Sequence, residues 1–160
     1  APDGYTPGDP VPVSIVAEAY LFLGDTLIQE PEEGDTNNLA RFGEAIKAFA
    51  KITKNFPTNE FAPLAWGRIG LAERIDRCMT AADSLAHALS ADPGWQVFAR
   101  PETGVVLFRP AHGHCNGVFA RLPDGLASVT RIGTEAWLRC VSANPNVDIA
   151  AVTAAVLKAA

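Results

Sequence analysis

The chain has 160 residues, of which 48% are hydrophobic and 19% charged, so it can bury a core and has room for one ordinary domain or two small ones. Its net charge is -5 and it has no cluster of Lys and Arg, which argues against nucleic acid and anionic membranes as partners. No apolar run approaches the roughly 20 residues of a membrane span, and no secretory signal is visible. The three cysteines form no CxxC pair. These features predict a soluble, cytoplasmic protein with free thiols.

The first part of the chain is predicted to be helical. Residues 1–12 are rich in Pro and Gly and predict an extended arm. Ser14 is expected to cap a helix that runs to about residue 29, because apolar residues recur there at steps of three and four. After an acidic, solvated loop at 30–38, a second helix is expected over 39–55, and Pro57 stops it.

The second part changes from a long helix to short strands. A third helical stretch begins near residue 60 and either continues or breaks at Gly67 and Gly70 before an amphipathic segment that ends at Ser90. Asn116 is expected to cap a short helix. Strands are predicted at 95–100, 104–109, 127–132 and 136–142, and a final helix at 147–159. This order predicts an α+β fold: a helical hairpin, a long helix, and a small, mostly antiparallel sheet with a C-terminal helix.

An internal match links two helical segments of the first part. The pattern Ala-aromatic-x-x-aliphatic-Gly starts at Ala19 and again at Ala65, with Ala-x-x-x-Phe and a terminal proline between the copies. Residues 13–70 therefore resemble a tetratricopeptide repeat unit, although the unit is longer than the standard period of about 34 residues. An ordinary helical hairpin is the alternative. The resemblance implies packing roles in an interaction module for Tyr20, Gly24, Ala45, Phe49, Pro57, Trp66 and Gly70.

A second resemblance begins at Gly67. Separated blocks keep a family order: the helix Gly67–Cys78, Asp92-Pro93, Pro101–Arg109, and Leu138-Arg139-x-x-x-x-Asn144-Pro145. Residues 67–160 resemble the C-terminal small domain of pyridoxal-phosphate-dependent group II decarboxylases, the aromatic-amino-acid type. The resemblance implies structural roles for Arg109, Arg139 and Asn144, with carboxylate binding by the two arginines as the alternative.

The two resemblances together predict the domain organisation. An arm at 1–12 precedes a repeat-like module at 13–66 and a decarboxylase-type small domain at 67–160. Because both patterns use the residues around 65–70, we expect a junction there, as in a natural, recombinant or designed fusion.

The catalytic chemistry of the second family is not expected in this chain. In that family a lysine, usually after a histidine, forms a Schiff base with the cofactor. The four lysines here are Lys47, Lys51, Lys54 and Lys158, and none follows a histidine. We therefore expect no catalytic residue and no cofactor; pyridoxal phosphate is implied only if a large domain is joined. The run His112-Gly113-His114-Cys115 is expected to be a solvated loop and not a metal site, because a closed zinc site needs four ligands.

Two functions from different classes follow from these patterns. The leading hypothesis is a non-catalytic protein-interaction module that carries an orphan decarboxylase-type small domain. The alternative is a fragment of a pyridoxal-phosphate-dependent decarboxylase whose catalytic large domain lies elsewhere. The first predicts a protein partner or self-association through apolar surface that the large domain covers in the family. The side chains expected on that surface are Trp95, Phe98, Phe119 and Trp137.

Overall fold

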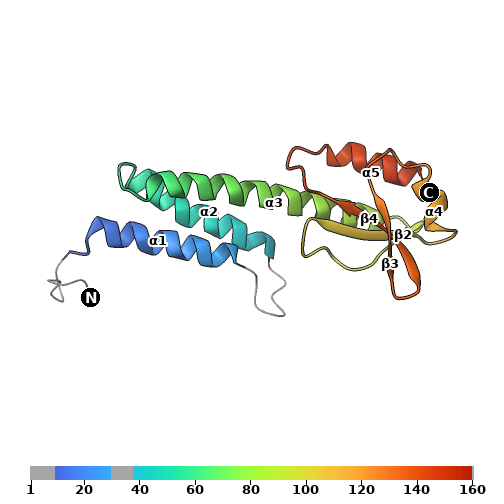
Figure 1. Ribbon diagram of the computed structural model, residues 1–160, viewed down its shortest axis with the longest axis horizontal. Helices are drawn as coiled ribbons and strands as arrows, with labels where there is room; N and C mark the ends of the chain where they lie inside the picture. The colour runs from blue at the N-terminus through green and yellow to red at the C-terminus, as the bar shows by residue number, and fades with distance from the viewer. Residues whose placement is uncertain (1–9, 30–37, 160) are drawn as a thin grey trace. The chain divides into compact units, whose positions relative to one another are not determined.

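A computed structural model describes residues 10–29 and 38–159 (Figure 1). Within these residues, three helices precede a four-stranded antiparallel sheet and a C-terminal helix, which confirms the predicted α+β fold. The chain divides into two compact units, residues 1–73 and residues 74–160. The predicted arm and acidic loop lie almost entirely outside the described residues, and the domain limits expected at 66 and 67 stay a prediction.

The first unit consists of α1 (Val13–Ile28), α2 (Asn38–Asn55) and the first part of α3 (Ala62–Ser90). The prediction that Ser14 caps α1 is wrong, because the helix starts at Val13 and Pro12 occupies the capping position. The carbonyl of Pro12 accepts the N–H groups of Ile15 and Val16 at 3.0 and 3.2 Å. Pro12 already has a φ of -56°, so the helix begins directly after it.

The core of the first unit combines small residues with a few large ones. A Cβ placed on Gly24 of α1 would collide with the ring of Phe49 in α2, so the two helices approach as closely as the missing side chain allows. Arg68 Nε lies 2.9 Å from Asp25 Oδ1, an ion pair without the alignment of a hydrogen bond. The buried residues are Ala17, Leu21, Ala45, Phe49, Ile52, Ala62, Ala65 and Ile69.

Helix α3 is continuous from Ala62 to Ser90, so the possible break at Gly67 and Gly70 does not occur. At both glycines the space that a Cβ would fill is empty to 4 Å. Glycine weakens a helix interior by only about 0.5–1 kcal/mol relative to alanine, which the buried apolar residues on either side of these positions offset. No described helix is both long and apolar enough to cross a membrane.

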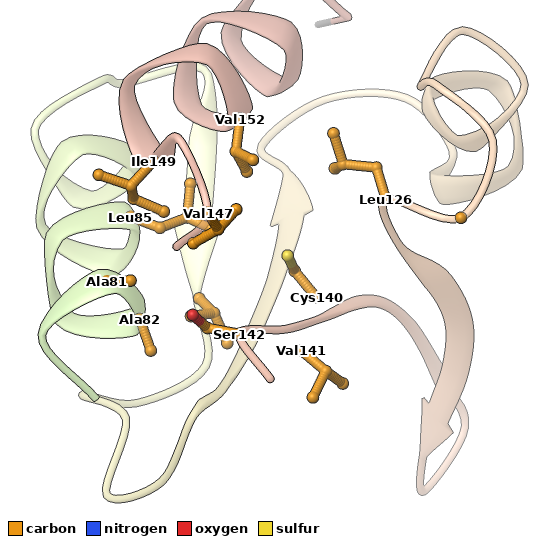
Figure 2. A pocket seen from close by; sticks show the side chains of 12 residues that line it. Ala81, Ala82, Leu85, Leu126, Cys140, Val141, Ser142, Val147, Ile149 and Val152 are labelled. Atoms are coloured by element: carbon orange, nitrogen blue, oxygen red, sulfur yellow. The ribbon is translucent and has the colours of Figure 1, made fainter. Parts of the chain in front are cut away.

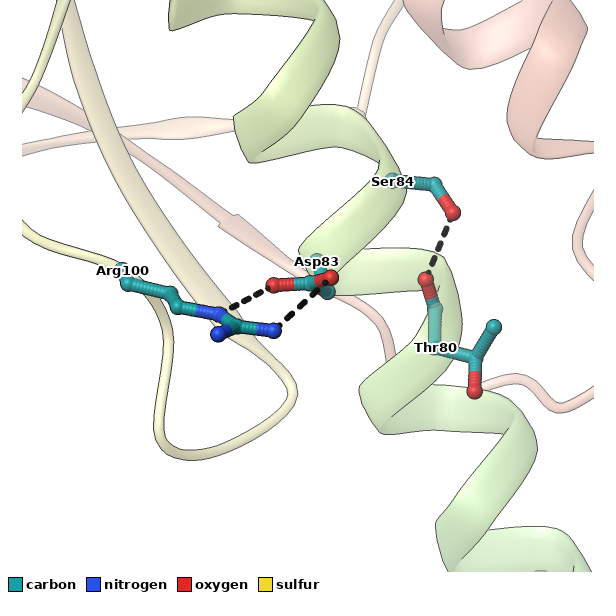
Figure 3. A network of polar contacts seen from close by, with 4 residues as sticks. All are labelled: Thr80, Asp83, Ser84 and Arg100. Carbon is teal, nitrogen blue, oxygen red and sulfur yellow. Dashed lines mark hydrogen bonds and ion pairs between the residues drawn. The ribbon is translucent and has the colours of Figure 1, made fainter. Parts of the chain in front are cut away.

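The second unit contains β1 (Trp95–Val97), β2 (Val105–Pro110), β3 (Ser128–Ile132) and β4 (Glu135–Val141) in the order β1-β2-β4-β3. Strand β1 is shorter than the predicted 95–100. Its ladder with β2 ends where the N–H of Phe98 donates to the Leu107 carbonyl at 2.9 Å. Arg100 then binds Asp83 of α3 through Nε at 2.8 Å and Nη2 at 3.4 Å (Figure 3).

Two helix starts in the second unit differ from the prediction. Helix α4 (Cys115–Phe119) has His114 at its capping position, and Asn116 lies inside it. Helix α5 (Ile149–Lys158) begins two residues late, because the Asp148 carboxylate accepts the N–H of Ala151 at 3.0 Å and caps it.

One face of the sheet is buried against the last turns of α3 and against α4 and α5. Along β2, Val106, Phe108 and Pro110 are buried while the residues between them are half-buried, which is the alternation of a strand with one covered face. Trp95 packs edge-on against Phe108 with 5.5 Å between ring centroids. The large buried residues of this core are Leu85, Leu89, Trp95, Val106, Phe108, Leu138 and Val156.

Candidate functional site

The second face of the sheet carries polar and aromatic side chains, and we call it the open sheet face. Residues directly opposite each other in antiparallel strands point to the same side of a sheet. The register pairs Gln96 with Arg109 and Leu107 with Arg139. Side chains two residues apart along each strand share that side. The open sheet face therefore includes Gln96, Phe98, Leu107, Arg109, Glu135, Trp137 and Arg139, together with Val105, Val141, Ser128, Thr130 and Ile132.

Arg109 is the centre of this face because its guanidinium contacts three neighbours. Its Nε donates to Gln96 Oε1 on β1 at 2.8 Å, and its Nη1 lies 2.7 Å from Glu135 Oε1 on β4. Its central carbon lies 4.4 Å from the ring centroid of Trp137, a cation–π contact. The side chain is 27% exposed, so water still reaches it. One residue thus links three strands across the face.

The aromatic part of the face has a covered ring and an exposed ring. Trp137 is only 5% exposed, whereas Phe98 is 51% exposed. The two rings meet edge to face, with centroids 5.2 Å apart and an interplanar angle of 86°. The indole N–H of Trp137 is buried and has no hydrogen-bond partner among the described residues. Phe98 is therefore an exposed aromatic side chain held against a fixed support.

Of the residues in the decarboxylase-like motif, Arg109 and Arg139 lie on the sheet and Asn144 lies in a turn. Arg109 and Arg139 both lie on the open sheet face, as the register requires. Arg139 is exposed and makes no ion pair within the described part of the chain. Asn144 lies between β4 and α5, where its Oδ1 accepts the N–H of Asn146 at 2.9 Å. That contact is typical of a turn.

Two of the four aromatic residues expected on uncovered surface are instead buried. Trp95 belongs to the core and Trp137 lies under Arg109 and Phe98, while Phe98 and Phe119 are exposed at 51% and 43%. Strand alternation separates Trp95 from Phe98, because residues an odd number of positions apart along a strand lie on opposite faces of the sheet. The alternation between Trp95 and Phe98 can be predicted from the sequence. The burial of Trp137 cannot, because Arg109 of the neighbouring strand covers its ring.

Four of the seven repeat-motif residues come together in the first unit. Ala45 and Phe49 are fully buried, Gly24 receives the Phe49 ring, and Tyr20 packs at the edge of the same core. The other three do not join them. Pro57 is exposed after the end of α2, Trp66 is 62% exposed, and Gly70 faces open space.

The His-Gly-His-Cys run separates its side chains. His112 and His114 are exposed, whereas Cys115 is buried and its thiol donates to the Ala136 carbonyl at 3.1 Å. Burial raises the pKa of Cys115, against the opposing effect of the Arg109 charge. Burial also raises the pKa of Cys140. Among the described residues, no three His, Cys, Asp or Glu side chains are placed to share a metal ion.

The lysines do not fit a Schiff-base cofactor. All four are exposed, three on α2 and one on α5. Lys47 forms an exposed ion pair with Glu44 on the preceding turn of α2, at 2.6 Å. A lysine that forms a Schiff base normally has its pKa lowered by burial or by a nearby positive charge.

Comparison with known proteins gives limited structural likeness. No protein-family model and no curated protein sequence matches the chain. It is similar to the glutamate decarboxylase domain of diaminobutyrate-pyruvate transaminase and L-2,4-diaminobutyrate decarboxylase from Vibrio parahaemolyticus, with 15% identity and a TM-score of 0.48. It is also similar to tryptophan decarboxylase from Catharanthus roseus in complex with L-tryptophan, with 17% identity and a TM-score of 0.46.

These likenesses cover only part of the other proteins. They include 78% and 74% of this chain, but only 29% and 31% of the decarboxylase chains. Both decarboxylases are structural neighbours at a level that does not assign the chain to their family. Neither the tetratricopeptide unit nor the fusion gains support from these comparisons.

Proposed function

We propose that the chain is a non-catalytic protein-interaction protein and that its open sheet face binds a second copy of the chain. The observation that carries this proposal is the exposed Phe98 ring, held 5.2 Å from Trp137, which in turn lies beneath the Arg109 guanidinium. Tryptophan and arginine are among the residues most enriched where alanine substitution weakens protein interfaces most. Here both are placed at the centre of one sheet face.

The rigidity of the face favours binding. Arg109 is held by Gln96, by Glu135 and by the indole ring, so its conformation is set before any contact forms. Ordering a long side chain at an interface costs about 0.5–1.5 kcal/mol, and prior fixation removes most of that cost.

The charges on the face favour a second copy as the occupant. Arg139 is exposed and makes no ion pair within the described residues, while the Glu135 side chain is 54% exposed beside Arg109. In a two-fold symmetric contact the same patch meets itself, so each charge faces a residue of its own patch. Such a contact can bring Arg139 of one copy to Glu135 of the other, and the exposed Phe98 rings supply the apolar part.

The non-catalytic part of the proposal rests on the lysines. The Schiff-base chemistry implied by the sequence resemblance requires a shielded lysine, and all four lysines of the chain are exposed. The Gly24–Phe49 contact fits a tetratricopeptide unit and an ordinary helical hairpin equally, and the exposed Trp66 does not fit the repeat packing.

The alternative proposal is that the chain is part of a pyridoxal-phosphate-dependent decarboxylase whose catalytic large domain lies elsewhere. The ordered sequence blocks from Gly67 to Pro145 favour it. It gives the open sheet face a different occupant, the large domain.

Sedimentation velocity over a wide range of protein concentration tests the proposal. The wild type is expected to pass from monomer to dimer as concentration rises, and Phe98→Ser is expected to remain monomeric throughout. Phe22→Ser is the matched control, because Phe22 is 62% exposed on α1 and is not on the face. A wild type that stays monomeric, or a Phe98→Ser variant that dimerises like the wild type, contradicts the proposal.

A further inference from the structure

The second unit contains a small apolar cavity, lined mostly by residues of α3, α5 and the covered side of the sheet. Its volume is about 150 Å³, and it lies between α3, the C-terminal end of β4 and α5 (Figure 2). Leu85 from α3 and Val152 from α5 line it, together with Leu126 from the segment before β3. It is partly open at the surface, and its volume is about that of cavities that accept molecules of benzene size.

One polar atom on the cavity wall has no partner. The hydroxyl oxygen of Ser142 is buried and makes no hydrogen bond to any described residue. Figure 2 shows Ser142 and Cys140 on the wall, with Val147 and Val152 nearby. Buried hydroxyl groups are nearly always hydrogen-bonded to protein or water, so this hydroxyl can donate to an acceptor that enters the pocket.

The backbone around Ser142 is tightly fixed. Its N–H donates to the Gly104 carbonyl at 2.6 Å. A Cβ on Gly104 would lie 2.9 Å from the carbonyl oxygen of Ser142, so only glycine allows this approach of the two strands. The backbone of Ser142 is therefore fixed beside the pocket, and only rotation about the Cα–Cβ bond moves the hydroxyl.

The cavity has no charged group on its wall. The only other polar side chain that lines it is Cys140, and burial raises the pKa of that thiol, so it is neutral at physiological pH. A charged ligand would lose its hydration without gaining an opposite charge. The wall therefore selects an uncharged, mainly apolar molecule.

We propose that this cavity binds a small uncharged molecule of six to eight non-hydrogen atoms (about the size of benzene) that carries one carbonyl or ether oxygen, and that the Ser142 hydroxyl donates to that oxygen. The hydrocarbon part contacts Leu85, Leu126 and Val152. This ligand site does not include Phe98, Arg109 or Trp137.

A matched pair of probes tests the proposal in the full chain. Cyclohexanone offers a carbonyl oxygen, and methylenecyclohexane has nearly the same shape without an acceptor. In titrations followed by ¹H–¹⁵N NMR, both are expected to shift the amides around the cavity in a saturable way. Cyclohexanone is expected to bind about three- to tenfold more tightly than its hydrophobicity alone predicts, which is the typical net effect of one hydrogen bond. The reference is the affinity difference of the two probes for Ser142→Ala.

Two variants separate the cavity from the hydrogen bond. Ser142→Ala is expected to lose the tighter binding of cyclohexanone and to bind methylenecyclohexane as the wild type does. Val152→Phe is expected to fill the cavity and to abolish binding of both probes, with an intact spectrum showing that it folds. The proposal is overturned if neither probe gives saturable shifts at the cavity in the wild type. It is also overturned if Ser142→Ala binds the two probes in the same ratio as the wild type does.

Discussion

Arg109 shows how several weak contacts of one side chain together stabilise the fold. Its hydrogen bond to Gln96, its ion pair with Glu135 and its stacking on Trp137 are each modest at a partly exposed position. Together they stabilise the fold more than any one of them does, because a single conformation of the guanidinium makes all three contacts. The same residue also shields the Trp137 ring from water, so that a tryptophan can lie on the uncovered side of the sheet.

Replacing Arg109 by alanine should therefore destabilise the second unit. We expect a loss of about 1–2 kcal/mol in the free energy of unfolding, from the cation–π contact and the two polar contacts together. Urea denaturation followed by tryptophan fluorescence measures it. Arg100→Ala is the matched control, because Arg100 is 72% exposed and has Asp83 as its partner. An unchanged denaturation midpoint for Arg109→Ala would show that the stack contributes nothing.

Cys140 makes the stability of the second unit fall at alkaline pH. Burial raises the pKa of its thiol above the ordinary 9.0. In the unfolded chain the thiol ionises at the lower, ordinary pKa, so the unfolded state binds fewer protons in the interval between the two values. Stability is therefore complete below about pH 9 and falls as the pH rises toward the folded-state pKa.

Cys140→Ala should reduce this alkaline loss of stability. Denaturation midpoints measured from neutral pH upward are expected to fall less steeply for the variant than for the wild type. Cys115 contributes in the same direction, since burial raises its pKa as well, so the double variant should be flatter still. Cys78→Ala, at a half-buried position, is the control. Parallel pH profiles for Cys140→Ala and the wild type would refute the assignment.

At the scale of elements, the contact between α1 and α2 depends on one missing side chain. Gly24→Ala places a Cβ inside the space of the Phe49 ring, and Phe49 is fully buried and cannot move out. We expect a loss of about 1–3 kcal/mol in stability, as for other overpacked cores.

Gly43→Ala is the matched control in α2, because no atom lies within 4 Å of the Cβ position there. Alanine at that helix position should stabilise the protein by about 0.5–1 kcal/mol, from the loss of glycine's freedom in the unfolded chain. Thermal unfolding of both variants checks the pair. If the two substitutions change the midpoint in the same direction, the helices do not approach closely at Gly24.

The helices could be predicted from the sequence to within a few residues because their signals are local. Apolar spacing of three and four residues and the stop near Pro57 lie within each segment. Helix starts were less certain, since Pro12, His114 and Asp148 competed with nearby candidates for the capping positions. The sequence predicts all four strands, but β1 ends at Val97 and not at residue 100, because its pairing with β2 stops there.

The candidate sites could not be predicted in the same way. The stack of Arg109 on Trp137 requires the register between β2 and β4, which α4 and β3 separate in sequence. The order of the sequence blocks singles out Arg109 and Arg139, but it does not show that both lie on the same face of the sheet. The cavity beside Ser142 is formed by α3, β2, β4, α5 and the loops next to them, and its existence depends on how fully their side chains fill the space between them.

At the scale of the whole molecule, the chain has two separate cores and one sheet face that presents an aromatic ring between charges. The structure assigns the large apolar residues of both cores to internal packing, so an interaction role depends on the remaining exposed groups. The tryptophans provide internal reporters for it, because Trp137 lies on the open sheet face, Trp95 is buried in the core, and Trp66 is 62% exposed on α3.

The most direct test of the interaction role is a dilution series followed by ¹H–¹⁵N NMR of the wild-type chain. The account predicts that the indole N–H signal of Trp137 and the amides of Phe98, Arg109 and Arg139 shift with protein concentration, while the indole signals of Trp66 and Trp95 stay in place. Spectra that do not change with concentration, or changes that centre on Trp66 and leave the Trp137 signal fixed, would contradict the assignment of the open sheet face as the surface that binds a second copy.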